Sequence, residues 1–133
     1  MNHPVANKDH LDLLNRDVDA WNTWRQANPK IKPDLSGADL SRADLTLANL
    51  SGALLKEANL VMANLRGTDL RHADLTQANL VGARLLGVDL VQADLSGADL
   101  RTAEDLTQEQ INHTRGDKHT RLPPGIKHPA AWH

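Results

Sequence analysis

The sequence of 133 residues contains no Cys, Phe or Tyr, and only three Trp. The absence of cysteine excludes disulfide frameworks, thiolate metal sites and cysteine nucleophiles. Aromatic side chains normally supply much of the buried area of a globular core. The hydrophobic residues that are present make up 40% of the chain, and they include 22 Leu and 17 Ala. We therefore expect a single domain with a narrow, aliphatic interior.

Long apolar runs and a strong excess of charge are also missing. No stretch is long and apolar enough to span a membrane. Residues 1–25 lack a basic start followed by an apolar stretch, so no signal peptide is visible. The formal net charge is −2, which gives no electrostatic footprint for nucleic acid. We predict a soluble, cytoplasmic protein with no direct nucleic-acid partner and no membrane partner.

A five-residue repeat occupies residues 33–102, and it comprises 14 consecutive units. Its central residue is always Leu: Leu35, Leu40, Leu45, Leu50, Leu55, Leu60, Leu65, Leu70, Leu75, Leu80, Leu85, Leu90, Leu95 and Leu100. A small residue, usually Ala, stands two positions before each Leu. Between the two lies Asp or Asn in 12 of the 14 units, and the exceptions are Leu54 and Arg84.

A period of five matches neither a helix nor a straight strand. On a helix, each Leu would advance about 140° from the previous one and point to every side. On a strand, an odd period would send successive Leu to opposite faces. Within one unit, however, Ala and Leu share a face, so a very short strand followed by a corner places both inside. Gly at six corner positions and Asp or Asn before most Leu suit such bends. The repeat therefore predicts a solenoid around a thin Leu-Ala core.

The run ADLSRADLTLANLSGALL resembles the pentapeptide-repeat proteins, whose consensus is A(D/N)LXX. The resemblance covers all 14 units, and the flanking segments are similar to those of some bacterial members. It implies an all-β fold, a right-handed quadrilateral β-helix in which four units make one square coil. Fourteen units then give about 3.5 coils, a stack about 17 Å tall at about 4.8 Å per coil.

Residues 1–32 are expected to cap the first coil, because a solenoid exposes its core and unpaired backbone at its ends. Apolar residues at spacings of three and four predict one amphipathic helix: Leu11, Leu14, Val18 and Trp21. Asp9 is the expected N-cap, and Asn28 with the proline after it ends the helix. We expect Trp21 or Trp24 to cover the mouth of the coil.

Residues 103–133 are expected to form the second cap. Residues 107–110 have the pattern of a capping box that opens a short helix, with Leu106 and Ile111 facing inward. The Pro-rich remainder is expected to be irregular and to wrap around the last coil, with Trp132 as its anchor. All three Trp thus fall outside the repeat.

No catalytic or cofactor motif is visible. The sequence lacks a Gly-rich phosphate loop, a nucleophile elbow and a His-Glu metal helix. A solid Leu-Ala interior leaves no cavity for a small ligand. We predict that the protein is not an enzyme and holds no cofactor or metal. A zinc site formed by His113, His119 and His128 is an alternative, but no thiolate or Glu pattern accompanies them.

The eight Asp of the repeat admit two interpretations. Hydrogen bonding at the corners is favoured, and a DNA mimic, which needs a dense column of acidic charge, is the alternative. Stacking in fours gives mixed columns, and the repeat holds nine acids against six bases. Some family members protect DNA gyrase from quinolones, so the resemblance implies a gyrase modulator or protector as an alternative function. Those members have long acidic stacks and Phe at many central positions, which this chain lacks.

Apolar residues at outward corner positions suggest an interaction surface. Five are singled out as a hypothetical protein-binding site: Val61, Met62, Val81, Leu47 and Leu86. Two alternatives are that a terminal segment covers them or that they are tolerated individually. The main functional hypothesis is a non-catalytic scaffold or protein-interaction module with an unidentified protein partner. We expect a monomer or a weak homodimer.

Overall fold

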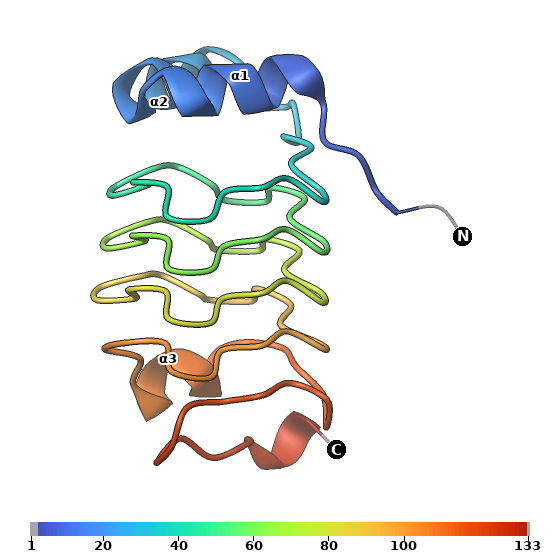
Figure 1. The fold of residues 1–133 in the computed structure, drawn as a ribbon, viewed down its shortest axis with the longest axis vertical. Helices are drawn as coiled ribbons and strands as arrows, with labels where there is room; N and C mark the ends of the chain where they lie inside the picture. The colour runs from blue at the N-terminus through green and yellow to red at the C-terminus, as the bar shows by residue number, and fades with distance from the viewer. Residues whose placement is uncertain (1–2, 133) are drawn as a thin grey trace.

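Parallel bridges between residues 20 positions apart define the fold. The computed structural model describes residues 3–132, and the outermost residues of the two expected caps, 1–2 and 133, lie outside that range. One ladder of bridges joins, in order, Asp34, Leu54, Asp74 and Asp94. Equivalent ladders run along the other three sides of the molecule. Four five-residue units therefore complete one coil, and the coils stack along the long axis (Figure 1).

Twelve of the 14 corners combine a side-chain hydrogen bond with a left-handed backbone residue; the units of Leu54 and Arg84 have no Asp or Asn to form this bond. The Oδ1 atom of the Asp or Asn accepts the N–H two residues later, as between Asp44 and Thr46 at 3.1 Å. The second corner residue that follows has a φ between 59° and 70° in the repeat, which explains why Gly is frequent there. Only one residue of each flat side is bridged, so the expected short strands are reduced to isolated bridges.

The core is the column of side chains inside the coils. Each of the 14 central Leu is at most 2% exposed. The residues two positions before them are also buried, except Ala43, which is half-buried. Thr68 replaces Ala in this row, and its hydroxyl donates to the carbonyl of Leu45 at 2.7 Å. A polar group in the interior is thereby satisfied.

Two helices, and not the single helix predicted, cover the first coil (Figure 1). They are α1 (Lys8–Arg16) and α2 (Val18–Ala27). The single-helix prediction was wrong because Asp17 has an extended backbone, with φ −171°, and its carboxylate accepts a backbone N–H of α2 at 2.6 Å. This contact makes Asp17 an N-cap. Asp9 was wrongly predicted as the first N-cap, because Asn7 performs that role.

Trp21 is the residue of α2 that closes the mouth of the first coil. Its side chain is fully buried, and its Nε1 donates to the carbonyl of Asn49 at 2.8 Å. Trp24 is half-buried and lies in an outer layer, with ring centroids 5.3 Å from Trp21 and 5.0 Å from His10. The two Trp therefore form a layered contact in which only Trp21 seals the core.

At the other end, α3 (Gln108–Asn112) begins at the predicted capping box, which is confirmed. Thr107 accepts the N–H of Gln110 at 3.1 Å, and the Gln110 side chain accepts the N–H of Thr107 at 2.7 Å. Ile111 is fully buried, whereas Leu106 is half-buried. The helix thus packs its apolar side against the last full coil.

The bridge ladders continue beyond residue 102, where the sequence predicts the repeat to end. Glu104, Arg115 and Arg121 extend three of the four ladders. The helix α3 is therefore inserted within a further coil and does not simply cover the stack. A short 3₁₀ helix, η1 (Ala130–Trp132), packs at this end. None of the helices within residues 3–132 has the length and apolar character needed to cross a membrane.

Candidate functional site

The five residues predicted to bind a protein lie on two neighbouring corners of the coils. Val61, Met62 and Val81 share one corner, and Leu47 and Leu86 share the next one along the chain. The side chains differ in exposure. Met62, Leu47 and Leu86 are 45%, 68% and 56% exposed, whereas Val61 and Val81 are half-buried. We call these five residues the apolar corner surface.

The backbone at Leu47 and Met62 is unusual for apolar residues. Both occupy the second corner position, with φ of 63° and 60°. This conformation costs an L-residue about 1–2 kcal/mol relative to the right-handed one. Every other unit of the repeat has Gly or a polar or charged residue at this position. Leu47 lies over Gly67 of the next coil, where an added Cβ would come within 2.7 Å of Leu47 Cδ2. Met62 lies over Gly82 in the same way.

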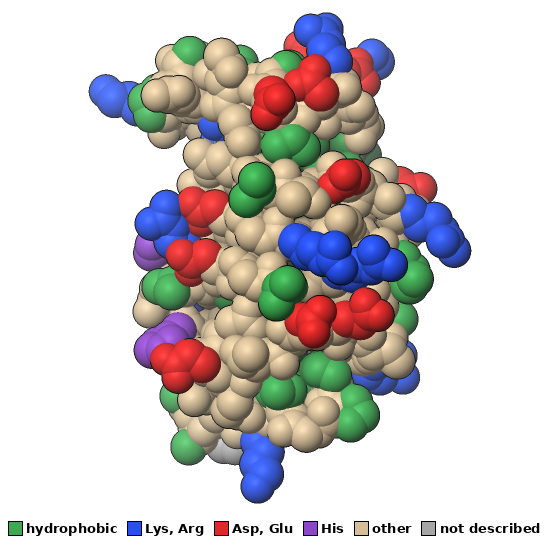
Figure 2. Space-filling view, turned by 90° about the vertical axis from the view of Figure 1, so that its left-hand side faces the viewer, with side chains coloured by type: hydrophobic (Ala, Val, Ile, Leu, Met, Phe, Trp, Pro, Cys, Tyr) green, Lys and Arg blue, Asp and Glu red, His purple; other side chains and the backbone are tan. Residues whose placement is uncertain are grey.

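Basic residues border the apolar corner surface. Arg42 lies on the same corner as Met62, one coil closer to the N-terminal cap. Arg66 lies on the same corner as Leu47 and Leu86, on the coil between theirs. Neither arginine forms an ion pair within residues 3–132, whereas Arg84 approaches Glu104 at 3.7 Å. On the face shown in Figure 2, apolar side chains are likewise interspersed with charged ones. We call Arg42 and Arg66 the basic rim of this surface; the carboxylate of Asp44, on the flat side between the two corners, accepts hydrogen bonds from Thr46.

The acidic side chains of the repeat are occupied by local contacts. Hydrogen bonds from Thr46 lower the pKa of Asp44; the bond from its hydroxyl has the larger effect, and the bond from its N–H has the smaller one. Arg71 binds Asp69 through Nε and Nη2, at 2.9 Å and 2.7 Å, and this contact lowers the pKa of Asp69. Arg101 holds Asp99 in the same manner. These neutralised pairs interrupt any column of negative charge.

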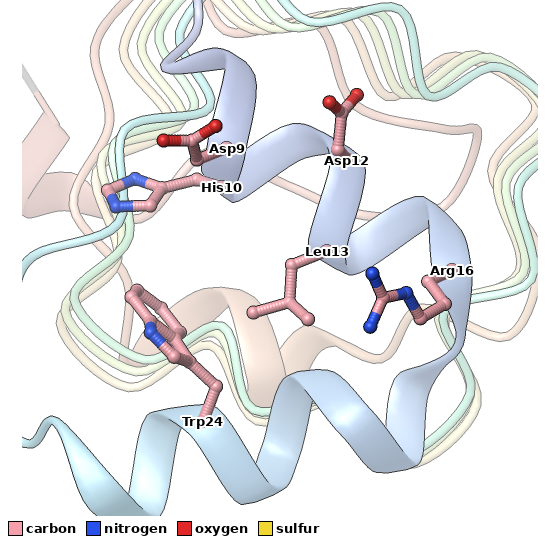
Figure 3. A pocket seen from close by; sticks show the side chains of 6 residues that line it. All are labelled: Asp9, His10, Asp12, Leu13, Arg16 and Trp24. Carbon is pink, nitrogen blue, oxygen red and sulfur yellow. The ribbon is translucent and has the colours of Figure 1, made fainter.

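A surface hollow lies between α1 and α2 (Figure 3). Its lining residues are Asp9, His10, Asp12, Leu13, Arg16 and Trp24. Figure 3 shows the carboxylate of Asp12 pointing away from Trp24, and this carboxylate pairs with Lys8 at 2.7 Å. The Nδ1 atom of His10 accepts the N–H of Asp34 at 3.0 Å, so the imidazole fastens α1 to the first coil. The hollow therefore brings together no pair of groups poised for acid–base catalysis.

The C-terminal histidines make separate contacts. His113 lies 3.3 Å from Glu109, and the Nε2 atom of His128 lies 2.7 Å from the carbonyl oxygen of Thr120. Within residues 3–132, no group of three His, Cys, Asp or Glu side chains is arranged to hold a metal ion. The structure gives no support to the alternative zinc site.

Two degenerate repeat units that follow α3 were not predicted from the sequence. The bridges of Arg115 and Arg121 place them at the Asp/Asn position, so residues 114–118 and 120–124 act as further units. Gly116 then stands at the Leu position of the first. The missing side chain is replaced by Trp132, because a Cβ at Gly116 would lie 2.8 Å from the indole ring. The available signal was the repeated Thr-Arg dipeptide, whose spacing of six conceals the period of five.

The predicted end residues thus have three different roles. Trp21 seals the first coil, Trp24 supports it from outside, and Trp132 completes the last coil from within.

A second feature without a sequence signal is Arg25, which is 9% exposed although it lies on a helix of the cap. Its surroundings form a basic hollow between the cap and the coils.

Comparison with known proteins gives a family and several similar structures. A family model described as pentapeptide repeats (8 copies) matches residues 34–71 and 68–104, more than half of the chain. A comparison with curated proteins gave no match.

Three solved structures are similar to this chain. HetL, a pentapeptide repeat protein involved in heterocyst differentiation regulation in Nostoc, has 29% identity and a TM-score of 0.48, over 64% of this chain and 37% of HetL. The pentapeptide repeat protein alr5209 from Nostoc has 32% identity and a TM-score of 0.39, over 79% of this chain and 86% of its own. Rfr23 from Cyanothece has 36% identity and a TM-score of 0.32, over 70% and 67%.

The chain spans little more than a third of HetL, so the activity of that whole protein does not transfer to it. The family match, by contrast, covers the same residues whose bridges have the 20-residue register. This chain belongs to the pentapeptide-repeat family, and its parallel bridges at a spacing of 20 residues form a β-helix.

Proposed function

We propose that this protein is a non-catalytic scaffold that binds a protein partner through the apolar corner surface. The observation that supports the proposal is the exposure of Leu47 and Met62 at positive φ. Six other units have a polar or charged residue at this position, so the fold does not require an apolar one. An apolar side chain that is both strained and solvated gains stability when a partner removes it from water, about 25 cal/mol per Å².

The basic rim favours a partner that carries carboxylates around an apolar anchor. In a symmetric contact between two copies, the same patch faces itself. Arg42 and Arg66 of one copy would then approach arginines of the other, and like charges oppose association. An acidic partner meets the same two arginines with opposite charge. We therefore propose a heterologous partner in preference to a second copy of this chain.

The filled interior and the local use of polar side chains support a non-catalytic role. The central Leu leave the coils solid, and Asp69 and Asp99 are paired with neighbouring arginines. The same pairs weigh against a DNA mimic, because such a surface needs unneutralised negative charge. No specific feature of this chain favours action on DNA gyrase, so we propose only the scaffold function.

Site-specific photo-cross-linking in cells that produce the protein tests the surface. A photoreactive phenylalanine analogue is placed at Met62 and, as a matched control, at Gln77. Gln77 has the same corner position and nearly the same φ, but it lies on a different corner. We expect a discrete cross-linked protein from position 62 and none from position 77. The cross-linked protein is then produced separately, and its affinity is measured with purified components.

Two variants decide whether the surface itself carries the binding. Val61→Asp places a charge on the apolar corner surface, and Val91→Asp places the same charge at the equivalent corner position elsewhere. We expect Val61→Asp to weaken binding at least about tenfold and Val91→Asp to leave it unchanged. Equal effects of the two variants, with unchanged circular dichroism spectra, would overturn the proposal. Dimerisation of the wild type that only Val61→Asp disrupts would assign the surface to self-association instead.

A further inference from the structure

A basic hollow lies where the segment after α2 passes the corner formed by residues 51–52. Its volume is about 300 Å³. Five of its lining residues are basic: Arg25, Lys30, Lys32, Arg71 and His72. No Asp or Glu lines the hollow among the residues that the structure describes. It lies on a different corner from the apolar corner surface, so it is independent of the function proposed above.

Arg25 is the residue that makes this hollow more than a cluster of surface lysines. Its Nη2 atom donates to the carbonyl and the hydroxyl of Ser51, at 2.7 Å and 3.3 Å. Its Nε and Nη1 atoms are shielded from solvent and have no hydrogen-bond partner among the described residues. Burial lowers the pKa of Arg25, which shows the direction of the desolvation cost. A buried guanidinium is normally matched by an acceptor for each of its edges.

The acidic groups nearest to the hollow are already used. Asp69 attracts Arg25, but both carboxylate oxygens of Asp69 are held by Arg71. Asp89 lies 3.7 Å from the Nε atom of the same Arg71. Within residues 3–132, neither Arg25 nor the two lysines of the hollow forms an ion pair. Their positive charges therefore remain uncompensated at one place on the molecule.

We propose that this hollow binds a phosphoryl group, either as free inorganic phosphate or as part of a phosphorylated side chain. The two lysine ammonium groups are donors that phosphate oxygens accept readily, and the shielded guanidinium of Arg25 adds its positive charge beside them. Lys30 and Lys32 are exposed and meet the anion first. Arg25 supplies a fixed charge at short range, where water screens it least. The bound anion compensates the charge that the folded chain leaves buried.

Nuclear magnetic resonance of the full ¹⁵N-labelled chain tests this site directly. Inorganic phosphate and O-phosphoserine are titrated separately at neutral pH and constant ionic strength, with chloride as the reference salt. We expect saturable shifts of the Arg25 Nε–Hε signal and the Gly52 amide. Tighter binding of O-phosphoserine would assign the site to a phosphorylated side chain. Equal or tighter binding of inorganic phosphate would assign it to the free ion.

Paired lysine variants supply the control. The double variant Lys30→Ser with Lys32→Ser removes two charges from the hollow and leaves the helices and coils intact. The variant Lys56→Ser with Lys118→Ser removes two exposed lysines elsewhere. We expect the first to weaken phosphate binding about fivefold and the second to have no effect. No saturation, the same shifts with chloride, or equal affinities of the two variants would mean an adventitious ion only and would overturn the proposal.

Discussion

The contact between Trp132 and Gly116 predicts strong energetic coupling between two residues far apart in the repeat pattern. Trp132 is 5% exposed, and its ring occupies the place of the Leu that the last coil lacks. Trp132→Ala should therefore destabilise the protein by about 3 kcal/mol, at the lower end for buried aromatic residues because the site is terminal. Gly116→Leu alone should cost about 2 kcal/mol, because its Cβ would lie 2.8 Å from three ring atoms.

The double variant is the informative one. With the indole removed, the leucine side chain introduced at position 116 can continue the ladder beneath Leu95, and burial of a Leu returns about 2 kcal/mol. If the two substitutions acted independently, the double variant would lose about 5 kcal/mol of unfolding free energy. If the introduced leucine takes the place of the indole, the loss is only about 1–2 kcal/mol. The coupling free energy should therefore be about 3–4 kcal/mol, well above the scatter expected for independent sites.

Urea unfolding followed by far-ultraviolet circular dichroism measures the four free energies of unfolding. Amide exchange at Leu95 adds a local readout, because its N–H donates to the carbonyl of Arg115 at 2.7 Å. This local measurement detects fraying of the last coil that a global transition can miss. Additive free energies, within about 0.5 kcal/mol, would refute the assignment of the indole to the missing Leu position.

Three further predictions concern the core, a corner and the acidic turns. Leu65→Asp should unfold the domain, because it buries a carboxylate at a position with no exposed surface; a soluble variant with an unchanged circular dichroism spectrum would contradict the interior assignment. Gly67→Ala should lower the free energy of unfolding by about 1–3 kcal/mol, since φ is +65° and the methyl group meets Leu47; a Leu47→Ala background should recover part of the loss in thermal melts. The pKa of Asp44 lies below its ordinary value of 3.8, so its contribution to stability is present above that value and is lost as the pH falls through the lower, folded pKa. Asp44→Asn keeps the Oδ1 acceptor and removes the titration, and its melting temperature should therefore fall less than that of the wild type between neutral and about pH 3.

The unbroken period of five made the core readable from the sequence. Leu65 and its thirteen counterparts repeat without exception, and a packed column tolerates few substitutions, so the pattern survives in every coil. Asp17 was missed because the apolar spacing of three and four continues across it, while its side chain gains more as an N-cap than the helix gains by continuing. The coil at Gly116 was missed because an insertion changes the local period and because its filling comes from Trp132, 16 positions later. Tertiary replacement of this kind leaves no local periodicity to detect.

The surface follows a different rule from the core, and this difference limits which functional residues a sequence can reveal. A repeat constrains the inward Ala and Leu and the Asp or Asn that closes each turn, but it leaves the two corner residues free. An ordinary polar residue at such a corner therefore carries no information about a partner. Leu47 and Met62 are informative because their φ is positive and their side chains are exposed, so both the backbone and the solvent oppose their presence. Arg25 is informative for the opposite reason: it is a charged side chain in a buried position, where desolvation disfavours the charge. In a solenoid whose interior is uniform, the residues that the fold itself disfavours are the ones to test first for binding.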